Sequence, residues 1–384
     1  MQGEKAGNFP EAAAEQAKDQ GVLAELRAMA ARSLARMYCP EEKIFVFRLR
    51  RTVRGVVSEG RSPRYTAITL IGLANETEDF RRSVLGDHGI HPVCDRLSQD
   101  IDQVTNLGDV ALSAWAAHAT GYPDRNKFWK RIVDLKPVER TYPVIELSWV
   151  LAAACIDPDS DKTGLAERLA QRLIQSFSVG SRVFPHVVGG SGTRSHVSCF
   201  ADMVYPIHAL SHYAKLTGNT KALDTATLCA GKICEVQGPS GQWWWHYDRR
   251  TGGIIEGYPV YAIHQDAMAP MALFALREAG GPDYSGAIRK GLDWLMYSPE
   301  IRGSLIDREA DLIWRKVARR ERGKLTRYLQ AGASRVNPSL RVPGLDFLFP
   351  PVSVDYEDRP YHLGWLLYAW PLQRAEEWDR RILK

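Results

Sequence analysis

The densest group of chemically active side chains in this sequence lies between residues 237 and 268. A Gly-Pro-Ser-Gly turn leads into three consecutive tryptophans, residues 243–245, which run directly into His246, Tyr247 and Asp248. Aromatic rings beside polar groups are typical of sugar sites, because the C–H face of a sugar ring stacks on an aromatic ring while its hydroxyls form hydrogen bonds. The same rings would suit a hydrocarbon chain that passes through a carbocation. The structural alternative is that the tryptophans plug one end of the fold.

Acidic, phenolic and imidazole groups around this stretch are candidates for acid–base catalysis. Glycoside cleavage needs two carboxyl groups with separated pKa values. Proton abstraction beside a sugar carboxylate instead uses a Tyr, His or Lys base and a cation that holds the acid. We predict that Asp202, Asp248 and His264 transfer protons. The expected helpers or alternative bases are Tyr205, Tyr258 and Tyr261.

Substrate positioning is expected from side chains that flank these groups or precede other helices. The predicted set is Arg64, Tyr65, Trp243, Trp244, His246, Gln265, Tyr361 and His362. A carboxylate at the start of a helix also serves as a cap or as a partner of the helix dipole, so each one has a structural alternative. If the three predicted proton-transfer residues are structural, the stretch 355–362 becomes the next candidate site.

No pattern in the sequence signals a metal, a cofactor or a nucleotide. His208 and His212 have the i, i+4 spacing of metal ligands but lack the glutamate of an HExxH pattern. The glycine-rich stretch 187–195 matches no phosphate-binding loop, and is either a flexible active-site loop or an ordinary connection. The six cysteines have no CxxC spacing, which argues against a disulfide framework or a zinc site. We therefore expect no metal and no bound cofactor.

Six stretches rich in Ala and Leu must position these groups, and each follows a polar and aromatic cluster. They are residues 66–74, 110–121, 144–154, 207–218, 267–281 and 363–372. Apolar residues recur three and four apart in them, and Ala and Leu favour helices. Amphipathic stretches that suit an outer layer follow at 126–135, 163–177, 220–236 and 284–296. Helical hairpins repeated in this way predict an all-α toroid of the (α/α)6 type, with its cleft at the N-terminal ends of the inner helices. Another all-α bundle is the alternative.

The predicted organisation has three parts. Residues 1–20 form a flexible tail, residues 21–60 hold an N-terminal helix and a short hairpin, and residues 61–384 form the toroid. Hydrophobic residues make up 45% of the chain, which is enough for a sizeable core. No apolar run of membrane-spanning length and no secretory signal occur, so we expect a cytoplasmic location.

The formal net charge is a mild +5, and much of the positive charge lies in the stretch 315–327. This stretch either binds an anion or forms a solvated helix face, and we favour the helix face. No nucleic-acid-binding motif is present, so nucleic acid is not an expected partner. The oligomeric state is not determined by the sequence.

With these helices and the Gly-Gln-Trp-Trp-Trp-His-Tyr-Asp cluster, the chain resembles the α/α-toroid superfamily over residues 60–375. This superfamily includes six-hairpin glycosidases, polysaccharide lyases and sugar epimerases, and terpenoid cyclases have the same shape. The stretch 258–264 is similar to a Tyr- and His-rich stretch of glucuronyl C5-epimerases. The resemblance implies a carbohydrate-active enzyme that acts on an oligosaccharide or polysaccharide, with a uronate-containing substrate as one candidate. The alternatives are a terpenoid-cyclase-like enzyme, whose DxDD and DDxxD motifs are absent, and a non-catalytic toroid that binds a glycan or another partner.

Overall fold

Six helices rich in Ala and Leu form a closed inner ring within residues 21–160, 164–321 and 323–382, the parts that the computed structural model describes. Around the ring they are α3 (Pro63–Leu73), α6 (Leu107–Ala119), α8 (Val144–Ile156), α10 (Ala201–Thr217), α12 (Ala269–Glu278) and α16 (Pro360–Ala369). The π-helical turn η4 (His264–Met268) leads into α12. Each inner helix packs against the next, and α16 packs against α3. Their residues are buried almost all round, as expected of helices between a core and an outer layer.

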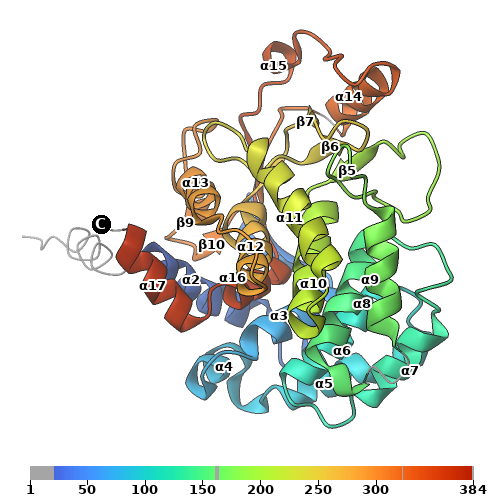
Figure 1. Cartoon of the computed structure of the whole chain (residues 1–384). Helices are drawn as coiled ribbons and strands as arrows, with labels where there is room; N and C mark the ends of the chain where they lie inside the picture. Colours follow the sequence, from blue (N-terminus) through green and yellow to red (C-terminus); the bar gives the residue numbers. More distant parts are fainter. Residues whose placement is uncertain (1–20, 161–163, 322, 383–384) are drawn as a thin grey trace, which may run out of the picture.

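More amphipathic helices form the outer layer (Figure 1). They are α2 (Val22–Met37), α4 (Glu78–Leu85), α5 (His91–Ser98), α7 (Asn126–Asp134), α9 (Leu165–Ser176), α11 (Thr220–Glu235), α13 (Ser285–Met296) and α17 (Leu372–Ile382). The first and last of these pack together, and Asp379 accepts hydrogen bonds of 2.9 Å from the backbone N–H groups of Leu23 and Ala24. A carboxylate from α17 thus caps the N-terminus of α2.

Helices α3 and α16 close the ring by direct backbone contact. A Cβ atom added at Gly72 would lie 2.3 Å from the carbonyl oxygen of Gly364, and one added at Gly364 would lie 2.7 Å from the carbonyl oxygen of Ile68. Only glycine fits on both sides of this contact. The two helices therefore approach more closely than any side chain would allow.

Aromatic rings fill the interior of the inner ring. Trp149 packs on Tyr205 at 5.0 Å between ring centroids, and Tyr205 lies 6.1 Å from Trp365. Trp115 continues the column, 5.4 Å from both Trp365 and Tyr368. In the described part of the chain, the centre of the toroid is consequently a packed core with a floor of aromatic rings.

Small antiparallel sheets lie around the beginnings of inner helices. The strands are β1 (Tyr38–Cys39), β2 (Ile44–Phe45), β3 (Arg48–Thr52), β4 (Gly55–Glu59), β5 (Val197–Cys199), β6 (His246–Asp248), β7 (Ile254–Glu256), β8 (Val260–Tyr261), β9 (Ile306–Asp307), β10 (Leu312–Ile313), β11 (Lys316–Ala318), β12 (Ser353–Asp355) and β13 (Glu357–Asp358). Three of the sheets within the described chain have three strands, in the orders β13-β3-β4, β5-β6-β7 and β12-β11-β8. Strands β5, β8 and β13 run almost directly into α10, η4 and α16, and the β5-β6-β7 sheet lies at the top of Figure 1 with α14 (Leu325–Val336) and α15 (Leu345–Leu348). These strands lie at the end of the ring where the inner helices begin, and we call this end the mouth.

The predicted all-α toroid and its six inner helices are confirmed. The helix-face interpretation of 315–327 is wrong at its beginning, because Lys316–Ala318 form β11 between β8 and β12. The predicted tail at 1–20 lies outside the described residues. No helix that the structure describes is long and apolar enough to cross a membrane.

Replacing Gly72 with Ala is expected to destabilise the protein, because the added methyl group meets backbone atoms of α16 that have no room to move. We expect a loss of about 1–3 kcal/mol in the free energy of unfolding, measured by chemical denaturation. The matched control is Gly286→Ala in α13, where nothing lies within 4 Å of the added Cβ. That change should stabilise the protein by about 0.5–1 kcal/mol. An equal change in the free energy of unfolding for Gly72→Ala and Gly286→Ala would contradict the backbone contact between α3 and α16.

Candidate functional site

The side chains of His186 and Asp202 form a hydrogen-bonded pair at the mouth, beside the start of α10. The Nδ1 atom of His186 is 3.1 Å from both carboxylate oxygens of Asp202. The Asp202 side chain is fully buried and also accepts a 2.7 Å hydrogen bond from the backbone N–H of Cys199, whereas 54% of the His186 side chain is exposed. The hydrogen bond to Asp202 raises the pKa of His186. The imidazole is thereby held in one orientation, its cationic form is favoured, and its other nitrogen is free of Asp202.

A cavity of about 310 Å³ opens beside this histidine. His186, Arg194, Cys199, Trp245 and His246 are among its lining residues. The β5-β6 register pairs Cys199 with His246 and so brings the second histidine to this cavity. Burial lowers the pKa of His246, with Arg194 and Arg327 as further causes. One cavity therefore contains an imidazole that favours the charged form and another that favours the neutral form.

Aromatic rings and arginine side chains pack against one another at the mouth. Trp245 stacks on Tyr261 with 4.3 Å between centroids, and the Arg315 guanidinium lies 5.2 Å from the centroid of the Tyr261 ring. Tyr361, which also interacts with Arg315, stacks on Tyr65 at 4.5 Å. Flat apolar faces next to fixed hydrogen-bond donors suit a sugar ring better than a polyene, which would favour an uncharged pocket.

Two carboxylates at the starts of α6 and α8 share one polar network. Arg64 bonds to Asp109 and to the side-chain oxygen of Asn106, and Asn106 donates to Glu146 at 3.2 Å. Arg64 also lies over the ring of Trp149. Burial raises the pKa of Glu146. A salt-bridged carboxylate thus lies close to one whose pKa is raised by burial, and two carboxyl groups in different environments can serve as base and acid.

Several predicted residues lie just beneath the rim. His264 is 5% exposed and packs on Phe200, Tyr261 and Trp245, with centroid distances of 4.5, 5.0 and 6.0 Å. Burial lowers its pKa to about 3, so the ring is neutral. Tyr205 is part of the aromatic floor, where burial raises its pKa.

Other predicted residues make structural bonds. Gln265 accepts from the backbone N–H of the fully buried Trp243 at 3.3 Å and donates to a backbone carbonyl. The carboxylate of Asp248 binds Arg250 at 2.7 Å and caps its backbone N–H. His362 bonds to Asp266 at 2.8 Å in the core.

Tyr258 and Trp244 lie together, away from the cavity of His186. Tyr258 donates to Glu300 at 2.9 Å, and its ring packs edge-on against Trp244 at 5.9 Å. The structure therefore brings Asp202, His246, Tyr261 and His264 into one neighbourhood through Trp245 and Cys199, while Tyr258 and Trp244 form a separate contact.

Within the described chain, His186, Cys199 and Asp202 bring three potential metal-ligating atoms within 4.8 Å of one another. Both oxygens of Asp202 are already bonded, and burial raises the pKa of the Cys199 thiol well above its usual value, which opposes the thiolate that a metal requires. The pair His208 and His212 has its Nε2 atoms 3.1 Å apart but lies in a separate cavity with Tyr368. This arrangement favours proton transfer over metal binding at the mouth.

His186, Asp109 and Glu146 were not among the predicted site residues. His186 lies next to the glycine-rich stretch 187–195, which has no periodicity that would fix its position. The sequence feature that points to His186 is its position between two inner helices, 16 residues before Asp202. The two carboxylates stand at helix starts, where a capping role is the ordinary expectation.

No protein-family model and no curated protein sequence matches the chain. Among solved structures, an unsaturated glucuronyl hydrolase specific for heparin is 13% identical, with a TM-score of 0.61 over 94% of this chain and 98% of its own. A sugar epimerase from a ruminal bacterium is 10% identical, with a TM-score of 0.58 over 91% and 98%. Cellobiose 2-epimerase from Bacillus thermoamylovorans is 11% identical, with a TM-score of 0.57 over 89% and 95%. These similarities show that the fold is the α/α toroid of such proteins.

Replacing Asp202 with Asn should lower the pKa of His186 toward the ordinary value of about 6.5, because the raised pKa comes from the carboxylate. The pKa is read from the pH dependence of the histidine NMR signals. A raised folded-state pKa stabilises the protein below the unfolded pKa, and this stabilisation is lost as pH rises through the folded pKa. The variant should therefore lose stability mainly on the acid side. The surface change Asp124→Asn is the control, and a His186 pKa that stays raised in Asp202→Asn would refute the pairing.

Proposed function

We propose that this protein is a carbohydrate-active enzyme that transfers protons to and from a sugar in the cavity between His186 and His246. The observation that carries the proposal is that one cavity holds two imidazoles with opposite pKa shifts beside the partly exposed Trp245. Groups whose environments move their pKa values apart are suited to act as acid and base. The substrate is an oligosaccharide or polysaccharide, and the solved structures of similar fold include a glucuronyl hydrolase and sugar epimerases.

Each residue has a defined role in this proposal. His186 acts as the acid, and buried Asp202 positions it and stabilises its charge. His246 acts as the base, with neutral His264 behind Trp245 as the alternative base. Trp245 stacks on the sugar, and Arg194 binds its oxygen atoms. Asp248 has a structural role, since its carboxylate holds Arg250 in the turn after β6.

A histidine pair favours proton abstraction at a ring carbon, as in an epimerase or lyase. Glycoside hydrolysis is the second candidate, and the different environments of Asp109 and Glu146 favour it. In that reaction Glu146 would donate the proton to the leaving oxygen. The basic and acidic groups of the mouth disfavour a polyene substrate.

A glycan-library screen in D2O is expected to identify the substrate and the reaction together. Proton abstraction would place deuterium on a ring carbon, hydrolysis would create new reducing ends, and elimination would create an unsaturated sugar, all visible by NMR. Isoprenyl diphosphates form the comparison set. Turnover of isoprenyl diphosphates without turnover of any sugar would refute the proposal.

His186→Asn and His246→Asn should each reduce turnover by about 10²–10⁴-fold, the usual cost of removing a positioned acid or base. Melting temperatures should stay within a few degrees of the wild type. His88→Asn, at an exposed histidine in η1 (Gly86–His88), is the matched control and should keep full activity. Full activity in both mouth variants would move the site to Asp109 and Glu146.

The rate should depend on pH through both histidines. The acid His186 must be protonated, so the rate falls as pH rises through its raised pKa. The base His246 must be neutral, so the rate falls as pH drops through its lowered pKa. In Asp202→Asn the alkaline limit of the kcat/KM profile should move to lower pH, while the acid limit stays in place. A shift of the acid limit alone would contradict the assignment of roles.

A further inference from the structure

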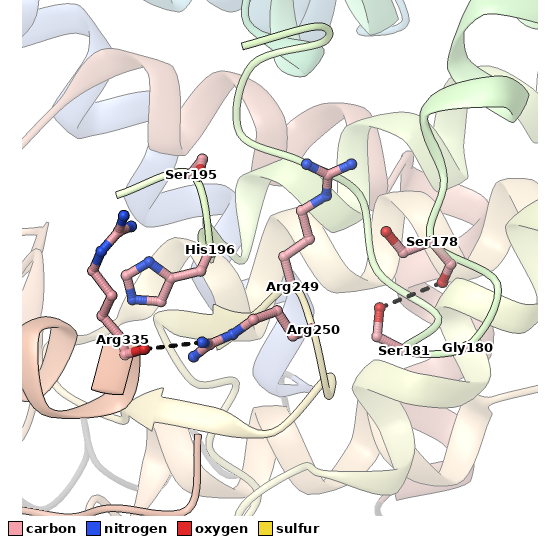
Figure 2. A pocket seen from close by; sticks show the side chains of 8 residues that line it. All are labelled: Ser178, Gly180, Ser181, Ser195, His196, Arg249, Arg250 and Arg335. Carbon is pink, nitrogen blue, oxygen red and sulfur yellow. Dashed lines mark hydrogen bonds between the residues drawn. The ribbon is translucent and has the colours of Figure 1, made fainter. Parts of the chain in front are cut away.

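Another cavity, of about 630 Å³, lies beside the β5-β6-β7 sheet and is lined by three arginines, with no acidic residue among its described lining residues (Figure 2). Segments from four parts of the described chain meet there: the turn after α9, the end of the glycine-rich stretch, the turn after β6 and the end of α14. The lining residues that matter are Ser181, Ser195, His196, Arg249, Arg250 and Arg335. Such a lining has an excess of positive charge and of hydrogen-bond donors.

Two of the three arginines are available to a ligand. Arg250 is neutralised by Asp248, with which it forms two side-chain hydrogen bonds of 2.7 and 3.0 Å. Arg335 donates to the backbone carbonyl of Thr193 at 2.6 Å. Neither Arg249 nor Arg335 forms an ion pair with a carboxylate of the described chain. A guanidinium without an acidic partner binds carboxylate or sulfate groups with paired hydrogen bonds.

His196 and serine residues line the same cavity. The His196 side chain is 6% exposed, and its Nε2 atom lies 3.0 Å from the carbonyl oxygen of Ala331, to which it donates. This bond fixes the ring between the end of α14 and the cavity. Ser181 and Ser195 bring hydroxyl groups to the lining, and a hydroxyl can donate to or accept from a sugar hydroxyl. The cavity therefore combines sites for an anionic group and for a hydroxyl.

The cavity is a neighbour of the proposed catalytic site. It shares Ser195 with a cavity of about 330 Å³ that is lined by the glycine-rich stretch. That cavity shares His186 and Arg194 with the one between His186 and His246. The segment from His186 to His196 therefore contributes lining residues to all three cavities.

We propose that the Arg249 and Arg335 cavity is a distal subsite for a carboxylate or sulfate group on a saccharide chain whose reacting sugar lies at His186. This inference rests on the proposed function and adds the substrate class, an acidic saccharide several sugars long. The arginines bind the anionic group, while the serines bind hydroxyls of the same sugar. A neutral chain would lose the arginine contacts, so the subsite selects acidic polymers.

The test measures binding of three hexasaccharides to the full chain by calorimetry: a hexagalacturonate, a heparin-derived hexasaccharide and a neutral cellohexaose. The double variant Arg249→Gln with Arg335→Gln should bind at least one acidic hexasaccharide about tenfold or more weakly than the wild type. Weaker binding of the hexagalacturonate identifies a carboxylate as the ligand. Weaker binding of the heparin-derived hexasaccharide alone identifies a sulfate. Binding of cellohexaose should not change. The matched control is the double variant Arg289→Gln with Lys290→Gln, which removes the same two charges from exposed positions of α13.

Each other outcome overturns a stated part. Acidic hexasaccharides that bind the double variant as tightly as the wild type would refute the subsite and leave the proposed function intact. Equal affinity of the wild type for a single-stranded DNA of matched charge would replace the subsite with a general polyanion surface. If no saccharide binds, inorganic sulfate is titrated by NMR. Sulfate shifts at Arg249 that vanish in the double variant would keep the anion site and refute the carbohydrate function, and no shifts would refute both.

Discussion

The contact between Gly72 and Gly364 is the constraint on which the rest of the structure depends. The ring has six inner helices, and its circumference is fixed by how closely the first and the last approach. With backbone against backbone, no side chain separates α3 from α16. The six helix beginnings then surround one small area, so groups from distant parts of the sequence lie close to one another. A wider ring would spread them over a shallow surface.

The aromatic floor explains why charge collects at the mouth. Trp149, Tyr205 and Trp365 exclude water from the centre, so most charged groups lie at the rim, and the buried Asp266 is paired with His362. There each buried carboxylate needs a cation, because an unpaired charge is costly in such surroundings. The stretch after Ile313 supplies many of these cations, as in the pairs Arg315–Asp355 and Arg319–Glu256. His186 pairs in the same way with the buried carboxylate of Asp202, but 54% of its own side chain is exposed.

The sequence predicts the fold well because helix signals are local. Apolar spacing and Ala content place all six inner helices, and polar clusters identify the end at which they begin. The site is harder to predict, since bonds between distant residues decide it. Gln265 was chosen for its place beside His264, but its bond to Trp243 fixes it in the core. Strand β11 depends on partners far along the chain, so its charges alone suggested a helix. His186 gains its chemistry only from the carboxylate that the fold places under it.

The cap on α2 links this architecture to protein synthesis. Asp379 binds the backbone N–H of Leu23, 356 residues earlier, so α2 leaves the ribosome long before its capping carboxylate exists. Contacts between distant residues slow folding, and chains of this size expose apolar surface while they wait. The contact between α3 and α16 also forms late, because α3 is synthesised long before α16. Five inner helices are therefore synthesised before the sixth can close the ring, and the surface of α3 that α16 covers stays open until the end of synthesis.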